Sequence, residues 1–309
     1  MPFLGVGGMA LVSVVVFGAL LQPAPGTAET WTAASPVASA AWPKEGQTSV
    51  LVEGLGGTGD LGSKGVQKPV PIASVTKVMT AYVVLRDHPL RSGEAGPDIT
   101  VDREAANESF SGTESSVPVR EGQRLSQRQV LELVLIPSGN NIARMLARWD
   151  AGSQEAFVEK MNRAARDLGM RHTTYTGASG LEETTVSTSG DQLKLARQVM
   201  RDAAFRAVVA KPSTTVPGVP GIIRNTNTLL GTAGVIGLKT GSSTPAGGAL
   251  MWAATASDGN GHDRLVLGVV LHQHAGTSPR QGLQAALGNS RTLIEAVREW
   301  LSTVTSGTR

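Results

Sequence analysis

Apolar and polar residues recur along the chain in patterns that predict a mixture of strands and helices. Residues with the alternation or apolar runs typical of strands lie at 47–52, 99–101, 235–239, 249–256 and 264–272. Residues with helical spacing lie at 74–85, 126–136, 142–149, 154–168 and 191–201. Ser126 and Gln129 form the capping-box pattern of a helix start, and Pro137 ends the same helix.

The order of these segments predicts an α+β fold. The middle third is mostly helical, whereas glycine-containing turns separate the strands of the last third and favour an antiparallel meander. An apolar stripe predicts a C-terminal helix that packs on this sheet: Leu293, Ile294, Val297, Trp300, Leu301 and Val304. We therefore expect an antiparallel sheet flanked by helices, with an inserted, mostly helical lobe.

The N-terminal segment differs from the rest of the chain. Residues 3–21 carry no charge, and residues 22–41 are rich in Pro, Ala, Ser and Thr. This predicts a signal peptide or membrane anchor at 1–28, a linker at 29–41 and one folded domain at 42–309, in a protein that is exported. No Lys or Arg precedes Lys44, so the usual basic start of a signal peptide is missing, which indicates a misassigned start or a basic segment upstream.

Composition excludes several classes of function. Lys and Arg exceed Asp and Glu by 28 − 25 = 3, and the positive charges are dispersed, so a nucleic-acid partner is not expected. The chain has no cysteine, which excludes disulfides, thiolate nucleophiles and Cys-based metal sites. The segment GLGGTG at 54–59 predicts a hairpin turn rather than a dinucleotide site, and His272 and His274 lack a third ligand, so no metal or cofactor is expected.

One lysine, Lys77, lies in the apolar stretch IASVTKVMTA, where burial of a charged amine would be costly unless the site uses it. Ser74 and Lys77 are three residues apart on the predicted helix, so their side chains can touch. A serine hydroxyl becomes a strong nucleophile when a neighbour accepts its proton, and a lysine can do so only if its pKa falls from about 10.4 towards 7. Burial and a second cation could lower that pKa.

Two further motifs follow in a fixed order. Ser138-Gly139-Asn140 follows the helix that Pro137 ends, and Lys239-Thr240-Gly241 ends a predicted strand. Each of the patterns S-x-x-K, S-x-N and K-T-G occurs once, with separations of 138 − 74 = 64 and 239 − 138 = 101 residues. This set is the signature of penicillin-binding proteins and class A β-lactamases.

The chain resembles the serine D-alanyl-D-alanine carboxypeptidases, which are low-molecular-mass penicillin-binding proteins. The resemblance covers residues 42–271 and includes PIASVTKVMTAYVVL, LELVLIPSGNNIA, TGASGL and NTNTLLGTAGVIGLKTGSSTPAGG. It implies the fold of the DD-peptidase and β-lactamase superfamily, in which the site lies between a helical lobe and a sheet-containing lobe. That fold agrees with the pattern of segments.

The resemblance also implies catalytic roles. Ser74 would attack the carbonyl between two D-alanines, with Lys77 as the general base. Ser138 would bridge the amines of Lys77 and Lys239 and pass a proton to the leaving group. The backbone N–H groups of Ser74 and Ser242 would form the oxyanion hole.

The remaining motif residues would bind substrate. Asn140 would hold the amide backbone of the substrate, and Lys239 would lower the pKa of Lys77 and attract the C-terminal carboxylate. The hydroxyls of Thr240 and Ser242 would bind the same carboxylate. Gly241 would let the strand edge approach the ligand.

These residues predict an exported serine D-Ala-D-Ala carboxypeptidase. It would act on peptidoglycan stem peptides at the extracytoplasmic face of the membrane or cell wall, with residues 3–21 as an anchor or a cleaved signal, and β-lactams would inhibit it covalently. A class A-like β-lactamase is one alternative, but no E-x-x-L-N segment lies between Asn140 and Lys239. A non-catalytic module that binds cell-wall peptide is the other. The 309 − 241 = 68 residues after Gly241 suffice only to complete the fold, so no second domain is expected.

Overall fold

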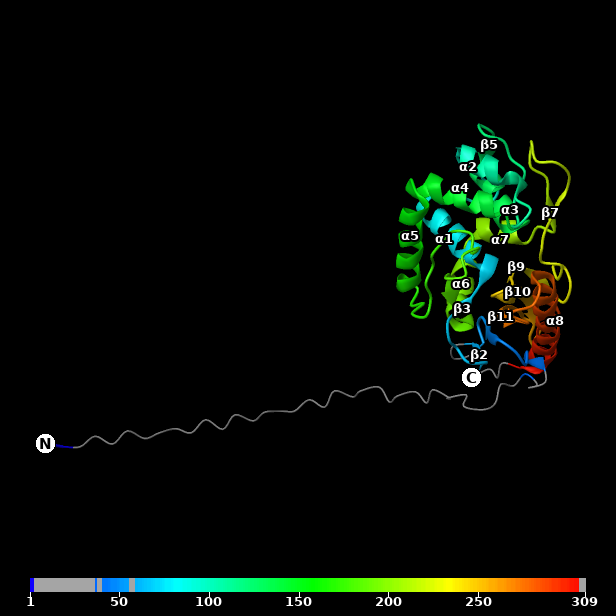
Figure 1. Ribbon diagram of the computed structural model, residues 1–309. Coiled ribbons are helices and arrows are strands. Elements are labelled where there is room, and N and C mark those ends of the chain that lie inside the picture. The colour runs from blue at the N-terminus through cyan, green and yellow to red at the C-terminus, as the bar shows by residue number, and fades with distance from the viewer. Residues whose placement is uncertain (3–36, 38–40, 56–58, 306–309) are drawn as a thin grey trace. The chain divides into compact units, whose positions relative to one another are not determined.

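The computed structural model describes residues 1–2, 37, 41–55 and 59–305 (Figure 1). The chain divides into two units, residues 1–32 and 33–309, and nearly all described residues belong to the second. The predicted signal or anchor segment at 3–21 and most of the linker lie outside the described residues. Within the described part, no helix has the length and apolar character needed to span a membrane.

A five-stranded antiparallel sheet forms the centre of the second unit. Its order is β2-β1-β11-β10-β9. The strands are β1 (Gln47–Val52), β2 (Asp60–Lys64), β9 (Val235–Ser243), β10 (Gly247–Ser257) and β11 (Asp263–Gln273). The predicted antiparallel meander is therefore confirmed. The K-T-G motif lies on β9, which is an edge strand, so one side of its backbone faces away from the sheet.

Helices make up most of the rest of the unit. They are α1 (Lys77–Asp87), α2 (Arg103–Asn107), α3 (Gln127–Leu135), α4 (Asn140–Ala151), α5 (Gln154–Asp167), α6 (Ser189–Val199), α7 (Ala203–Val209) and α8 (Pro279–Thr303), with 3₁₀ turns η2 (Ala73–Thr76) and η3 (Glu108–Phe110). Three two-stranded ribbons join them: β3 (Val70–Pro71) with β6 (Val186–Ser187), β4 (Asp98–Thr100) with β5 (Arg124–Ser126), and β7 (Ser213–Thr214) with β8 (Ile223–Arg224). The capping box predicted at Ser126 is present.

Two hydrophobic cores lie on opposite faces of the sheet. The alternation along β1 shows this, because Val50 and Val52 belong to the core beneath α8, whereas Leu51 belongs to the core shared with α1 and α6. Figure 1 shows α8 on one side of β9, β10 and β11, and α1 and α6 on the other. The predicted α+β fold with an inserted helical lobe is confirmed, and the lobe comprises α2 to α5 and α7.

The helix that carries Ser74 and Lys77 starts in a way that helical spacing does not reveal. The spacing predicts a helix over 74–85, and the structure forms it in two parts, the 3₁₀ turn η2 followed by α1 from Lys77 onward. Ala73 has φ 45°, in the left-handed region that a residue with a Cβ seldom adopts. Such backbone strain persists where the surrounding structure fixes it, and it clusters at functional sites.

Candidate active site

Ser74 and Lys77 lie side by side at the start of α1. Ser74 is partly buried in η2, whereas the Lys77 side chain is fully buried. The Lys77 Nζ atom donates a hydrogen bond to Ser74 Oγ at 2.9 Å, so the contact predicted from their spacing is present. The apolar neighbours in the sequence keep water away from this amine while leaving the hydroxyl accessible.

The Lys77 amine has two further partners. Its Nζ donates to Asn140 Oδ1 at 2.5 Å and to the Ser179 backbone carbonyl at 2.7 Å. An ammonium has three protons, and these three contacts use all of them. Of the three partners, both carbonyl oxygens can only accept, and the Ser74 hydroxyl alone can also donate.

The surroundings of Lys77 favour a neutral amine. Burial lowers the pKa of Lys77 well below its usual value, and the charges of Lys239 and Arg144 lower it further, while Glu114 and Glu182 oppose this. When the amine is neutral it keeps two protons, which the two carbonyl oxygens accept. Its lone pair then faces Ser74 Oγ, in position to take the serine proton.

Asn140 is held at both ends of its amide. Its Oδ1 accepts from Lys77, and its Nδ2 donates to Glu114 Oε2 at 2.8 Å. Glu114 in turn accepts from Arg144 through both carboxylate oxygens, at 2.6 and 3.1 Å. The Asn140 backbone N–H donates to the Ser115 carbonyl at 2.8 Å, which fixes the start of α4 against the segment that carries Glu114.

Ser138 lies in the turn between α3 and α4. It is 4% exposed and has φ 68°, a left-handed conformation. Its Oγ is buried and has no hydrogen-bond partner among the residues that the structure describes, so the expected bridge between the Lys77 and Lys239 amines is not formed in this structure. A buried hydroxyl without a partner is costly, and it leaves a donor and an acceptor free for a bound group.

Lys239 is the second fully buried amine of the site. Its Nζ donates to the Thr240 carbonyl at 2.9 Å, and burial lowers its pKa to about 7. The Thr240 hydroxyl lies 2.6 Å from that of Thr226, and the Thr226 N–H donates to the Ile136 carbonyl just before the Ser138 turn. Thr226 thus ties the K-T-G strand to the S-x-N turn.

Gly241 brings β9 against η2. A Cβ added to Gly241 would lie 2.9 Å from the Ile72 carbonyl oxygen and 3.1 Å from the backbone nitrogens of Ser74 and Val75. The glycine therefore permits the strand to approach the backbone of Ser74, whereas the sequence led us to expect a close approach to the ligand. The first hydrogen bond of η2 runs from the Val75 N–H to the Ile72 carbonyl, which leaves the Ser74 N–H ahead of it.

The structure thus gathers the three sequence motifs around one amine, and it adds residues that the sequence did not single out. These are Glu114, Arg144, Ser179 and Thr226. Ser179 lies in the segment TGASGL, which was recognised by resemblance but had no assigned role, because its contribution is a backbone carbonyl. Glu114 lies in a polar loop and Arg144 on the amphipathic helix α4, and charged side chains in such places usually face solvent.

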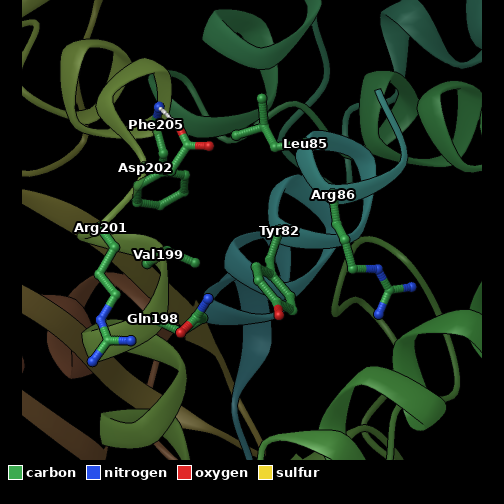
Figure 2. Close-up of a pocket in the computed structure, with 8 residues that line it drawn as sticks. All are labelled: Tyr82, Leu85, Arg86, Gln198, Val199, Arg201, Asp202 and Phe205. Carbon is green, nitrogen blue, oxygen red and sulfur yellow. Dashed lines mark hydrogen bonds between the residues drawn. The ribbon is translucent and has the colours of Figure 1, made fainter. Parts of the chain in front are cut away.

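A cavity of about 320 Å³ lies away from these residues, between α1 and the α6–α7 connection. Figure 2 shows the lining residues of α1 on one side (Tyr82, Leu85 and Arg86) and those of α6, α7 and their connection on the other (Gln198, Val199, Arg201, Asp202 and Phe205). None of the motif residues lines this cavity. It is therefore separate from the site around Lys77.

Comparison with protein families finds one model, described as D-alanyl-D-alanine carboxypeptidase, that matches residues 38–274. A D-alanyl-D-alanine carboxypeptidase of Streptomyces sp. strain K15 is 33% identical over 214 residues, which cover 64% of this chain and 71% of the relative. A D-alanyl-D-alanine endopeptidase of Pseudomonas aeruginosa is 35% identical over 192 residues and is covered to 60% of its length. The chain therefore spans between about three fifths and three quarters of these two relatives.

Solved structures give the same result. The Streptomyces K15 DD-transpeptidase superposes with a TM-score of 0.69 at 27% identity, covering 81% of this chain and 95% of that one. Penicillin-binding protein 6B of Escherichia coli gives a TM-score of 0.68 at 28% identity, covering 82% of this chain and 78% of that one. The expected superfamily fold is confirmed by these matches.

Proposed function

The chain belongs to the D-alanyl-D-alanine carboxypeptidase family of serine hydrolases, and from this premise we propose that Ser74 is its nucleophile and Lys77 its general base. The family acts on peptidoglycan peptides that end in D-Ala-D-Ala and is acylated by β-lactams. In this chain the reaction would remove the terminal D-alanine of a stem peptide through an acyl-enzyme on Ser74.

The observation that carries the proposal is the set of partners of Lys77. Two of the three accept hydrogen bonds only, so the lone pair of a neutral amine faces Ser74 Oγ. General-base catalysis requires this geometry together with a lowered pKa, and both are present at Lys77. Positioned proton transfer of this kind contributes about 10²- to 10⁴-fold to a rate.

Acylation would proceed by proton transfer and attack. Lys77 takes the Ser74 proton as Oγ bonds to the carbonyl carbon of the scissile peptide, and the oxyanion is held by the backbone N–H groups of Ser74 and Ser242. The C–N bond then breaks, and the leaving D-alanine nitrogen receives a proton through the Ser138 hydroxyl. Water hydrolyses the ester and restores Ser74.

Substrate binding would use β9 and α4. A protonated Lys239 attracts the C-terminal carboxylate, and the hydroxyls of Thr240 and Ser242 donate to it. The Nδ2 of Asn140 has a second proton beyond the one given to Glu114, and this proton can be donated to a backbone carbonyl of the peptide. These roles rest on the resemblance, on the burial of Lys239 and on the edge position of β9.

The enzyme would work outside the cytoplasm, as its cell-wall relatives do. Residues 3–21 would direct export and either remain as a membrane attachment or be removed with the signal peptide. A β-lactamase activity is disfavoured because no glutamate-led E-x-x-L-N segment is present to release the penicilloyl group quickly. Penicillin is therefore expected to stay bound for a long time.

Release of D-alanine from a model acyl peptide ending in D-Ala-D-Ala tests the proposed function. The wild-type protein should release one D-alanine per peptide, and a matched peptide ending in L-Ala-L-Ala should stay intact. Ser74→Ala should lower the rate by about 10³-fold or more, as the loss of a serine nucleophile does in other hydrolases. A wild-type protein that binds the peptide without releasing D-alanine would instead support a non-catalytic binding module.

A further inference from the structure

We propose that Glu114 is a positioning residue that fixes the orientation of the Asn140 amide and thereby directs the lone pair of Lys77 to Ser74. The inference rests on the proposed function and extends it to a residue outside the three motifs. It follows from the chain of contacts that runs from Arg144 through Glu114 and Asn140 to the amine.

The orientation of an amide matters because its two ends have opposite hydrogen-bonding capacity. With Oδ1 towards Lys77, Asn140 can only accept from the amine, as the structure shows. With the amide rotated by half a turn, Nδ2 would face Lys77 and donate to its lone pair. Asn140 would then compete with Ser74 for the base, and proton transfer from the serine would be lost.

Glu114 excludes the rotated amide because an ionised carboxylate can only accept. Its Oε2 accepts from Asn140 Nδ2 at 2.8 Å, and a rotated amide would bring an oxygen against this oxygen. The Glu114 side chain is 8% exposed, so water has little access to relieve that repulsion. Only one orientation of Asn140 satisfies both Glu114 and Lys77.

Arg144 keeps Glu114 in the ionised form. Burial opposes ionisation, but the hydrogen bonds from Arg144 and Asn140 outweigh it and hold the pKa of Glu114 below its usual value. Arg144 also binds Glu108, which makes no hydrogen bond to Asn140. Glu108 therefore offers a matched control, since it is a second carboxylate on the same arginine.

The test compares the rates at which Ser74 is acylated by benzylpenicillin in the wild type, Glu114→Gln and Glu108→Gln, across pH. Glutamine can present either its oxygen or its NH₂ group to Asn140, so it no longer selects one orientation. We expect Ser74 of Glu114→Gln to be acylated about 10- to 100-fold more slowly. A loss of this size follows when a residue that orients a metal ligand through a hydrogen bond is removed from a metalloenzyme. Glu108→Gln should stay within about twofold of the wild type, as expected for a carboxylate at the rim of the cluster.

The pH profile separates positioning from a general loss of structure. The charged groups that act on Lys77 are Lys239 of β9, Arg144 of α4, Glu114 and Glu182. Removing the negative charge of Glu114 lowers the pKa of Lys77, so the acidic limb of the acylation rate should move to lower pH. A variant that is only destabilised would have a lower fraction of protein acylated, but the acidic limb of its pH profile would not move.

A Glu114→Gln protein that acylates like the wild type with an unmoved limb overturns the inference, and so does an equal loss in Glu108→Gln. If the melting curve shows that Glu114→Gln does not fold, Glu114→Asp is tested instead. Aspartate keeps the negative charge, so the acidic limb of the pH profile should stay in place, but its shorter side chain should slow acylation. An unchanged rate in Glu114→Asp would overturn the inference. A wild-type protein that forms no adduct would contradict the proposed function itself.

Discussion

At the scale of single residues, the proposed mechanism needs two buried lysines in different protonation states. In it Lys77 is neutral and accepts the Ser74 proton, whereas Lys239 is charged and attracts the substrate carboxylate. Burial lowers the pKa of both amines. The charges of Lys239 and Arg144 lower the pKa of Lys77 further, while Glu114 and Glu182 oppose this. The proposed mechanism requires that Lys77 lose its proton before Lys239 as the pH rises.

This order predicts a bell-shaped dependence of kcat/KM on pH for a peptide ending in D-Ala-D-Ala. The value should rise with pH as Lys77 loses its proton, and it should fall again above a pKa of about 7 as Lys239 becomes neutral. In Lys239→Arg the guanidinium stays charged at high pH, so any kcat/KM that remains should not fall above a pH of about 7. A wild-type profile that stays flat from pH 6 to about 9 would be inconsistent with these roles.

At the scale of elements, the site depends on how closely β9 approaches η2. The contact is made by backbone atoms, because Gly241 has no side chain to separate the strand from the Ile72 carbonyl and the Ser74 nitrogen. Neither element can shift easily, since β9 is paired with β10 and η2 continues into α1. The geometry around the nucleophile is thus set by packing of elements.

Gly241→Ala should test this packing. Its methyl group would lie 2.9 Å from the Ile72 oxygen, so the strand must move and the oxyanion site must widen. We expect kcat/KM to fall about 10²-fold, as a misplacement near 1 Å produces. Gly288→Ala, in the middle of α8, is the control, because its added methyl group would meet nothing within 4 Å. Its kcat/KM should be unchanged, and its free energy of unfolding should rise by about 0.5–1 kcal/mol. Equal activity in both variants would refute this account of the strand.

The elements themselves could largely be predicted from the sequence. Periodicity gave β1 and α5 nearly to the residue, and the capping box gave the start of α3. It also gave the three strands of the meander, although β9 continues to Ser243, four residues beyond the predicted end. The 3₁₀ turn at Ser74 could not be predicted, because tertiary contact with β9 fixes it and helical spacing does not reveal such contacts. α7 was also missed, since its seven residues are too few to show a clear period.

At the scale of the whole molecule, the site combines parts that lie far apart in the sequence. The motif residues could be predicted because their chemistry and order form a signature, but the contact of Glu114 with Asn140 could not. Glu114 lies 26 residues before Asn140, with β5 and α3 between them, and no local pattern encodes the packing that brings the two side chains together. The same reason applies to the Ser179 carbonyl, which reaches Lys77 across 102 residues.

The central claim is that a desolvated Lys77 activates Ser74. The most direct measurement is the rate of covalent acylation by benzylpenicillin, with the adduct followed by intact mass spectrometry and its position found by peptide mapping. The wild type should gain one adduct on Ser74. Lys77→Arg keeps a positive charge but cannot give up its proton, so the account predicts acylation slower by about 10²- to 10⁴-fold. An adduct on another residue, or a Lys77→Arg protein that acylates at a near-normal rate, would contradict it.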